Sequence, residues 1–164
     1  MDKNKLSYGV GIQDANYTIK VTEYIEDYYP SRKQKLIWVC PYYQRWYNML
    51  KRCYSEKFHN KHPTYKGCSV CEEWLLFSNF RGWVITQDWE GNQLDKDLLT
   101  QGNKVYSQKD CVFVCKKINT FVNDRGNARG KYLIGCSWDK LHNMFRSSCS
   151  NPFTGKQVNL GLFN

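Results

Sequence analysis

The stretch LDKDLLTQGNKVYSQKDCVFVCKKINTFVND, residues 94–124, decides the fold prediction for this chain. Gln93–Leu99, in which acids sit beside apolar residues, and the apolar run Cys111–Val114 are strand candidates, and Gly102-Asn103 between them is a turn signal. Behind them, Lys116–Asn123 places three apolar side chains on one helical face. Strand, loop, strand and helix within about thirty residues is the size of a ββα unit.

Three charged residues on the first predicted strand carry the chemistry. The period of two along a strand predicts Asp95 and Asp97 on one face, with Lys96 on the other. Two carboxylates on one face bind a shared metal, or one binds while the other acts as a base. The alternative is a solvent-facing turn in which Lys96 is the ion-pair partner of the two acids.

At these residues the chain is similar to the active-site segment of the HNH (His-Me finger) homing endonucleases of bacteriophages. The lead-in RWYNMLKRCYSEKFHNKHPTYKGCSVCEEWLLFSNF, residues 45–80, resembles that of a phage subfamily, so the likeness spans about residues 38–123. It implies an α+β fold with a ββα-metal core that hydrolyses double-stranded DNA with Mg²⁺ or Mn²⁺. By the resemblance, Asp95 matches the metal-binding acid, Asp110 the loop Asn, and Asn119 the helix ligand.

The chain departs from the family at the base, because Lys96 stands where the family has His. An ammonium group is a donor only and accepts no proton. Asp97 or a loop histidine, His59 or His62, would have to take that role; otherwise the nuclease is impaired. The predicted catalytic residues are Asp95, Lys96, Asp97, Asp110 and Asn119, and the predicted metal ligands are Asp95, Asp97 and Asn119.

The net charge of +9 is unevenly distributed. Residues 31–66 hold nine Lys or Arg against one acid, residues 116–146 hold seven against two, and residues 67–100 hold six acids against two basic residues. Two basic blocks around an acidic centre fit a phosphate-binding surface around a cation site. The alternative is that the charges only solvate the surface. The predicted DNA contacts in the basic blocks are Arg45, Lys51, Arg52, Lys116 and Lys117.

Outside the ββα stretch, the lead-in predicts several further elements. Tyr42–Tyr54 has apolar residues (Trp46, Met49, Leu50 and Cys53) at helical spacing. We expect a strand over Leu36–Cys40, a polar loop over Lys57–Gly67, and a second helix over Glu72–Phe80. A strand or extended arm is expected at the N-terminus.

The tail ARGKYLIGCSWDKLHNMFRSSCSNPFTGKQVNLGLFN, residues 128–164, resembles the start of the ethylene-response-factor (AP-two) type of DNA-binding domain. The resemblance implies a three-stranded sheet that reads the major groove. It assigns the candidate contacts Arg129, Trp138, Lys140, Arg146 and Lys156. In that family a helix covers the back of the sheet. Without it the sheet is marginal, so we expect it to dock on the nuclease domain, to be completed by a homodimer or a protein partner, or to be partly disordered.

Eight cysteines leave two interpretations open. Cys68, Cys71, Cys111 and Cys115 make a possible structural zinc site of four thiolates, although their spacing is poor for HNH proteins. Otherwise they are small buried residues.

We expect an N-terminal arm (1–37), an HNH-like domain (38–124), a linker (125–130) and an incomplete AP-two/ERF-like module (131–164). No run of 18 apolar residues occurs, so a cytoplasmic protein without a membrane span is expected. The resemblance to phage enzymes implies that this cytoplasm is that of a phage-infected host. The leading prediction is a phage endonuclease. The alternatives are a catalytically dead descendant that binds DNA or a protein, and an interaction protein such as an inhibitor of host defence.

Overall fold

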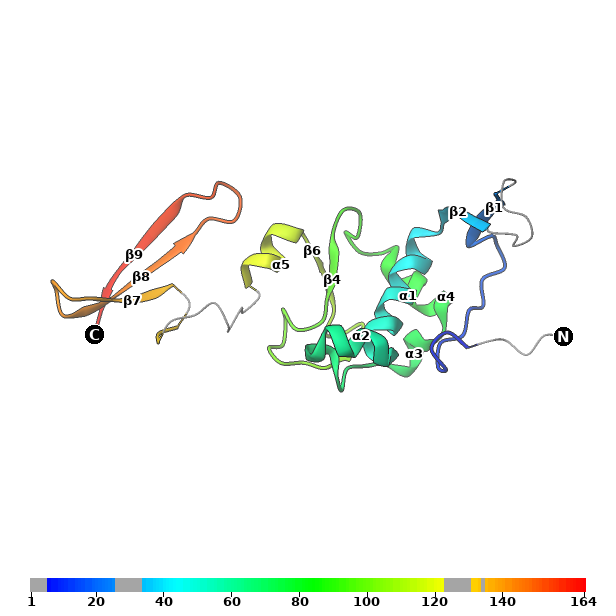
Figure 1. The fold of residues 1–164 in the computed structure, drawn as a ribbon, viewed down its shortest axis with the longest axis horizontal. Helices are drawn as coiled ribbons and strands as arrows, with labels where there is room; N and C mark the ends of the chain where they lie inside the picture. The colour runs from blue at the N-terminus through cyan, green and yellow to red at the C-terminus, as the bar shows by residue number, and fades with distance from the viewer. Residues whose placement is uncertain (1–5, 26–33, 123–130, 134) are drawn as a thin grey trace. The chain divides into compact units, whose positions relative to one another are not determined.

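The structure is a computed structural model that describes residues 6–25, 34–122, 131–133 and 135–164. It divides the chain into two compact units, residues 1–113 and 114–164. Helices and strands are mixed along the chain, as the sequence predicts (Figure 1). Among the described residues, no helix is long and apolar enough to cross a membrane. The predicted linker, residues 125–130, lies outside the described residues.

The centre of the first unit is helix α1 (Pro41–Tyr54), which confirms the helix predicted over Tyr42–Tyr54. The four apolar side chains at helical spacing, Trp46 to Cys53, are all buried in it. The indole Nε1 of Trp46 donates to the Trp74 carbonyl oxygen at 2.7 Å, so the one polar atom of this buried ring is satisfied. Periodicity alone was sufficient here because the helix packs along one face.

The predicted polar loop over Lys57–Gly67 is wrong. Helix α2 (Glu56–Lys61) and the short 3-10 helix η1 (Pro63–Tyr65) occupy it. The Ser55 hydroxyl caps α2 by accepting from the Phe58 amide at 3.3 Å. The Phe58 ring packs on the His62 ring with centroids 4.4 Å apart, which gives this polar segment its own small aromatic contact.

The single helix predicted over Glu72–Phe80 is also wrong, because the chain forms α3 (Glu72–Leu75) and α4 (Phe77–Val84) with Leu76 extended between them. A distant segment occupies the break. The Ile12 amide donates to the Leu75 carbonyl at 2.8 Å, and the Ile12 carbonyl accepts from the Phe77 amide at 3.0 Å. Backbone groups that a continuous helix would have paired internally are therefore paired by the N-terminal segment.

Gly11, next to Ile12, is buried against α1. A Cβ built there would overlap the Leu50 and Trp46 side chains. The close approach of this segment to the helix therefore requires glycine.

Short strand pairs surround the helices. An antiparallel pair joins β1 (Lys20–Tyr24) to β2 (Gln34–Val39), close to the predicted strand Leu36–Cys40. A parallel pair joins β3 (Ser69–Val70) to β5 (Val105–Tyr106). The strand β4 (Gln93–Asp95) pairs with β6 (Val112–Val114), and helix α5 (Lys116–Val122) follows β6 after Cys115. The predicted strand Gln93–Leu99 thus ends at Asp95.

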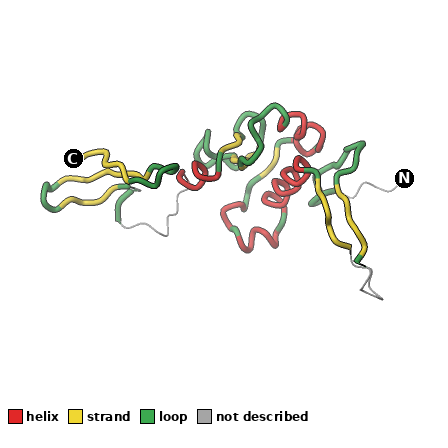
Figure 2. The backbone as a smooth tube through the Cα atoms, turned by 90° about the horizontal axis from the view of Figure 1, so that it is seen from above, coloured by secondary structure: helices red, strands yellow, loops and turns green. Residues whose placement is uncertain are grey.

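The second unit contains the predicted three-stranded antiparallel sheet: β7 (Cys136–Asp139), β8 (Met144–Ser150) and β9 (Gln157–Phe163), in that order (Figure 2). Trp138, Phe145 and Phe163 are register partners across the three strands. The neighbouring register row is Ser137, Arg146 and Leu162. Because successive side chains alternate, these two rows lie on opposite faces of the sheet.

Candidate functional site

The end of β4 is a turn built on the Asp95 side chain. Its Oδ1 accepts from the backbone amides of Asp97 at 2.9 Å and Leu98 at 2.7 Å. A carboxylate that accepts from the amides two and three residues on bends the chain away from a strand. The prediction that Asp95 and Asp97 share a strand face is therefore wrong, because the strand has ended before Asp97.

Lys96 lies inside this turn with its ammonium group buried. Its Nζ donates to Asp97 Oδ2 at 3.0 Å and to the Asn103 carbonyl oxygen at 2.8 Å. Asp97 itself is half-exposed. A buried ammonium is tolerated when it is paired and hydrogen-bonded, as here. The Lys96–Asp97 ion pair that the turn interpretation expected is thus present.

Asn103 holds the loop closed from the other side. Its amide Nδ2 donates to the carbonyl oxygens of Lys96 at 2.6 Å and Val105 at 2.7 Å, and its Oδ1 accepts from the Val105 amide at 3.0 Å. Sequence reasoning noted Gly102-Asn103 only as a turn signal and missed this role. This role depends on the side-chain NH₂ group of Asn103 lying within reach of two backbone carbonyl oxygens of the loop. The sequence alone does not show that arrangement.

Asp110 forms a separate turn just before β6. Its Oδ2 accepts from the Ser107 hydroxyl at 2.7 Å. The pKa of the neighbouring Cys111 thiol is raised to about 12: burial is the main cause, a backbone hydrogen bond at Ser107 opposes it, and the charges of Asp110, Asp95 and Cys71 add to the rise. Asp95 and Asp110 therefore both lie near the Cys111 thiol.

Asn119, the predicted helix ligand, lies in α5 of the second unit. Its backbone N–H donates to the Cys115 carbonyl oxygen at 3.0 Å, within the first turn of the helix. A metal shared between Asn119 and Asp95 stays a prediction.

Carboxylate oxygens are the ligands that Mg²⁺ and Mn²⁺ prefer, and Mg²⁺ is commonly held by one or two carboxylates with waters. Asp95, whose Oδ2 takes no part in the hydrogen bonds of its turn, and the half-exposed Asp97 fit that donor chemistry. Within the described part of the chain, no three His, Cys, Asp or Glu side chains are grouped so that they could hold a metal.

The possible zinc site of four cysteines is not among the metal-holding groups of the described residues either. All eight cysteines are free thiols, with Cys68 and Cys111 buried and Cys71 and Cys115 partly buried. Burial raises the pKa of Cys71, while hydrogen bonds from the Trp74 and Gln108 amides oppose that rise. Cys115 belongs to the second unit. A four-thiolate zinc site therefore stays a prediction without a geometric argument for it.

The basic residues predicted on α1 differ in their surroundings. The Arg45 guanidinium lies 4.6 Å from the Trp89 ring centroid and donates to the Trp89 carbonyl at 3.2 Å. Arg52 lies 5.8 Å from the Tyr65 ring and is partly buried, whereas Lys51, 5.6 Å from the Phe58 ring, is exposed. Lys51 is therefore the cation of this helix with the most open position.

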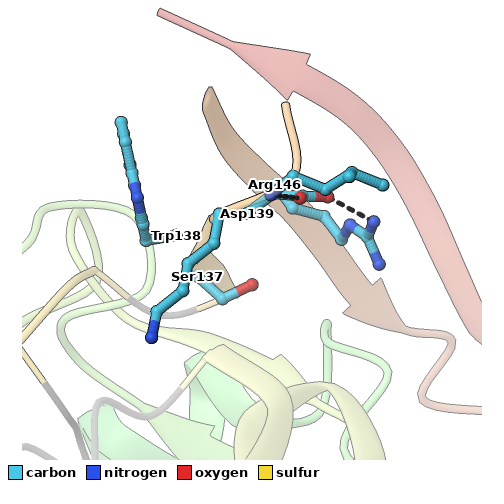
Figure 3. A pocket seen from close by; sticks show the side chains of 6 residues that line it. Ser137, Trp138, Asp139 and Arg146 are labelled. Atoms are coloured by element: carbon cyan, nitrogen blue, oxygen red, sulfur yellow. Dashed lines mark hydrogen bonds and ion pairs between the residues drawn. The ribbon is translucent and has the colours of Figure 1, made fainter. Parts of the chain in front are cut away.

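In the second unit, a shallow hollow of ~360 Å³ brings together three predicted DNA contacts, Trp138, Lys140 and Arg146 (Figure 3). Asp139 organises it. Its Oδ1 accepts from the Leu141 and His142 amides, and its Oδ2 pairs with the Arg146 guanidinium and with His142 Nδ1. Desolvation acts against ionisation of Asp139, but these hydrogen bonds outweigh it and lower the pKa of the carboxyl.

Figure 3 also shows Trp138 projecting away from Arg146, as their positions on opposite faces of the sheet require. The two side chains therefore do not present one flat contact surface. Of the remaining predicted contacts, Lys116, Lys117 and Lys156 are exposed, and Lys117 lies 5.8 Å from the Phe153 ring. Arg129 lies outside the described residues.

Compared with protein-family models, curated proteins and solved structures, the chain shows no match.

Proposed function

We propose that this protein is a metal-dependent DNA endonuclease of the HNH type. The observation that carries the proposal is the locked turn Asp95-Lys96-Asp97 at the end of β4, closed by Asn103. A rigid loop that fixes acidic side chains beside a short strand pair is what metal-assisted phosphodiester hydrolysis needs from its scaffold. Along the chain, the paired strands β4 and β6 precede α5, and this is the order of elements in the ββα unit that the resemblance implies.

In this proposal Asp95 would hold the metal, which would supply Lewis-acid stabilisation of the phosphate. The role of Asn119 as helix ligand comes from the resemblance alone. Asp97 is the base, because it is a half-exposed carboxylate next to the ligand. Lys96 acts as a positioning residue: its ammonium donates to Asp97 Oδ2 and to the Asn103 carbonyl, and therefore accepts no proton itself.

Asn103 takes the place of the loop asparagine in this proposal. Its amide bridges Lys96 and Val105, whereas Asp110 caps a turn through Ser107. By position in the sequence, the resemblance matches the loop asparagine of the family to Asp110. The hydrogen bonds favour Asn103 for that role.

The experiment is a nicking assay on supercoiled plasmid with Mg²⁺ or Mn²⁺, with chelator as the blank. The variants Asp95→Asn, Asp97→Asn and Asn119→Ala are expected to lose cleavage at least about a hundredfold while they still bind DNA. Lys57→Ala, an exposed change in α2, is the matched control and should cleave normally. Undiminished cleavage by Asp95→Asn would remove the proposed site.

One observation favours a second candidate, a protein that binds DNA without cutting it. The group at the position of the family's base, Lys96, is buried and bonded to two acceptors. Salt-dependent binding to a duplex, with no cleavage in either metal over a long incubation, would identify this case.

A further inference from the structure

Helix α2 and the short helix η1 form an exposed segment of the first unit, which we call the α2–η1 segment. None of their side chains is buried, and the structure describes both helices in full. Hydrogen bonds hold the segment in place. The His59 Nε2 donates to the Arg52 carbonyl oxygen at 2.8 Å, and the Lys104 Nζ donates to the Thr64 carbonyl oxygen at 2.8 Å. A surface segment fixed by polar contacts, without a buried face, is suited to binding a partner.

The Phe58 ring of this segment holds two exposed polar side chains next to each other. The Lys51 Nζ lies 5.6 Å from the centroid of the Phe58 ring, and the centroid of the His62 ring lies 4.4 Å from it. An ammonium group is attracted to an aromatic face, and a residue four positions further along a helical segment lies on the same side of it. Lys51 and His62 are both exposed, whereas Phe58 is partly buried. The ring therefore positions both side chains at the surface.

The polar atoms of these two side chains are available to a partner. Among the described residues, neither the Lys51 ammonium nor the His62 imidazole has a hydrogen-bond or ion-pair partner. Arg52 differs, because its guanidinium donates a hydrogen bond to the Tyr106 side chain inside the protein. Residues 51–66 hold five Lys or Arg against a single acid. Accessible donors in a basic stretch of this kind favour an anionic partner.

Lys104 connects the α2–η1 segment to the proposed metal site. It follows Asn103, whose side chain closes the Lys96 turn, and its own side chain donates to the Thr64 carbonyl oxygen of η1. Its carbonyl oxygen accepts from the Ser69 amide at 2.9 Å, so Lys104 is bonded at both ends. All of these residues belong to the first unit. The exposed donors are therefore tied through Lys104 to the loop that carries the acidic turn.

We propose that Lys51 and His62, positioned by the Phe58 ring, bind backbone phosphates of DNA beside the proposed metal site. The inference rests on the proposed function for the identity of the ligand. An ammonium group and an imidazole N–H both donate hydrogen bonds, and phosphate oxygens accept them. Contacts of this kind position a protein on a duplex without reading its sequence. His62 is then a phosphate-binding residue, and the role of base stays with Asp97.

The test measures the affinity of the full chain for a duplex of about 30 base pairs by fluorescence anisotropy, in chelator so that nothing is cut. Lys51→Gln is expected to weaken binding about tenfold and to reduce the slope of log K against log salt by about one, because one phosphate contact is lost. His62→Ala should weaken binding about threefold through the loss of one hydrogen bond. Lys57→Gln is the matched control: Lys57 is exposed, and it lies about 100° around α2 from Phe58. Its affinity should stay within about twofold of the wild type.

Thermal unfolding shows whether each variant is folded, and Lys51→Arg, which keeps the positive charge, should retain the wild-type salt slope. Wild-type affinity and salt slope in Lys51→Gln, together with wild-type affinity in His62→Ala, would overturn the inference and leave the proposed nuclease standing. Absence of any duplex binding by the wild-type protein would overturn both. A loss in Lys57→Gln as large as that in Lys51→Gln would also overturn the inference, since general charge would then explain the binding.

Discussion

At the scale of single residues, the decisive feature is that Lys96 is held rather than free. Its ammonium has two oxygen acceptors and its carbonyl accepts from Asn103, so one residue is fixed at both ends. A neighbouring lysine and aspartate on a strand would point to opposite faces and could not pair in this way. The turn made by Asp95 brings them together.

Replacement of Asn103 tests whether its side chain holds the Lys96 loop closed. Asn103→Ala removes three hydrogen bonds and leaves the Lys96 carbonyl without its partner, so we expect a loss of about 1–3 kcal/mol in unfolding free energy. Urea unfolding followed by tryptophan fluorescence measures it. Asn60→Ala, an exposed change in α2, is the control and should have an effect within about 0.5 kcal/mol. Equal effects at both positions would contradict the role given to Asn103.

The buried thiols give a second residue-scale prediction. Burial, followed by the neighbouring Cys68 thiol, raises the pKa of Cys53 from 9.0 to about 12. The pKa of Cys111 is likewise raised from 9.0 to about 12, with burial as the main cause. Because the thiolate is the reactive form, a rise of about three pKa units lowers alkylation about a thousandfold at neutral pH. Mass spectrometry after brief iodoacetamide treatment of the folded protein is expected to find both thiols unmodified, and early labelling of Cys53 would contradict its burial.

At the scale of elements, distant contacts override local preference. Glu72–Phe80 has the apolar spacing of one helix, yet it breaks at Leu76 because Ile12 pairs with the backbone on both sides of the break. Those hydrogen bonds come from a segment about sixty residues away in the chain, so no window around Leu76 contains the information.

Two glycines test the packing of these elements. Gly11→Ala inserts a methyl group into the Leu50 and Trp46 side chains, so we expect a destabilisation of about 1–3 kcal/mol. Gly82→Ala, in α4, meets nothing within 4 Å and should stabilise the protein by about 0.5–1 kcal/mol through helix propensity. Chemical denaturation of both variants gives the comparison. A neutral Gly11→Ala would show that the N-terminal segment does not approach α1 so closely.

The β7–β8 connection gives a pH prediction. The folded state lowers the pKa of Asp139 below its ordinary value of 3.8, through hydrogen bonds from His142, Arg146 and Leu141 that outweigh desolvation. The stability this contributes is fully present above about pH 4 and is lost as the pH falls through the lower, folded-state pKa. Hydrogen exchange of the β7 and β8 amides is expected to accelerate in that window. Asp139→Asn should exchange faster at neutral pH and show little of this acid dependence; a wild-type acid profile in the variant would contradict the assignment.

At the scale of the whole molecule, the described residues of this positively charged chain form an aromatic core in the first unit and a three-stranded sheet in the second. The core of the first unit is formed by apolar and aromatic side chains from α1, α3 and α4, together with β3, β5 and β6. Its cohesion therefore comes from burial of apolar surface. The sheet of the second unit is a separate compact body whose largest aromatic side chains are partly exposed.

Removal of the metal tests whether stability and DNA cleavage have separate sources. Because an apolar core holds the first unit, prolonged dialysis against chelator is expected to leave the thermal unfolding midpoint and the far-ultraviolet circular dichroism unchanged. Cleavage of DNA should disappear and return when Mn²⁺ is restored. Unfolding on chelation, reversed by Zn²⁺ alone, would instead support the four-thiolate site.

The three-stranded C-terminal sheet was expected from the resemblance of residues 128–164. The sequence by itself determined α1 and its buried face, and the concentration of acids and polar turns around Asp95. Each depends on local periodicity or on residues that are close in the chain, and local patterns survive folding when they agree with the packing. Only the tertiary structure decided that Leu76 breaks a helix, that Asn103 closes the Lys96 loop, and that Trp138 and Arg146 lie on opposite faces of their sheet. These depend on hydrogen bonds and strand register between segments distant in sequence, where a single residue's type does not specify its partner.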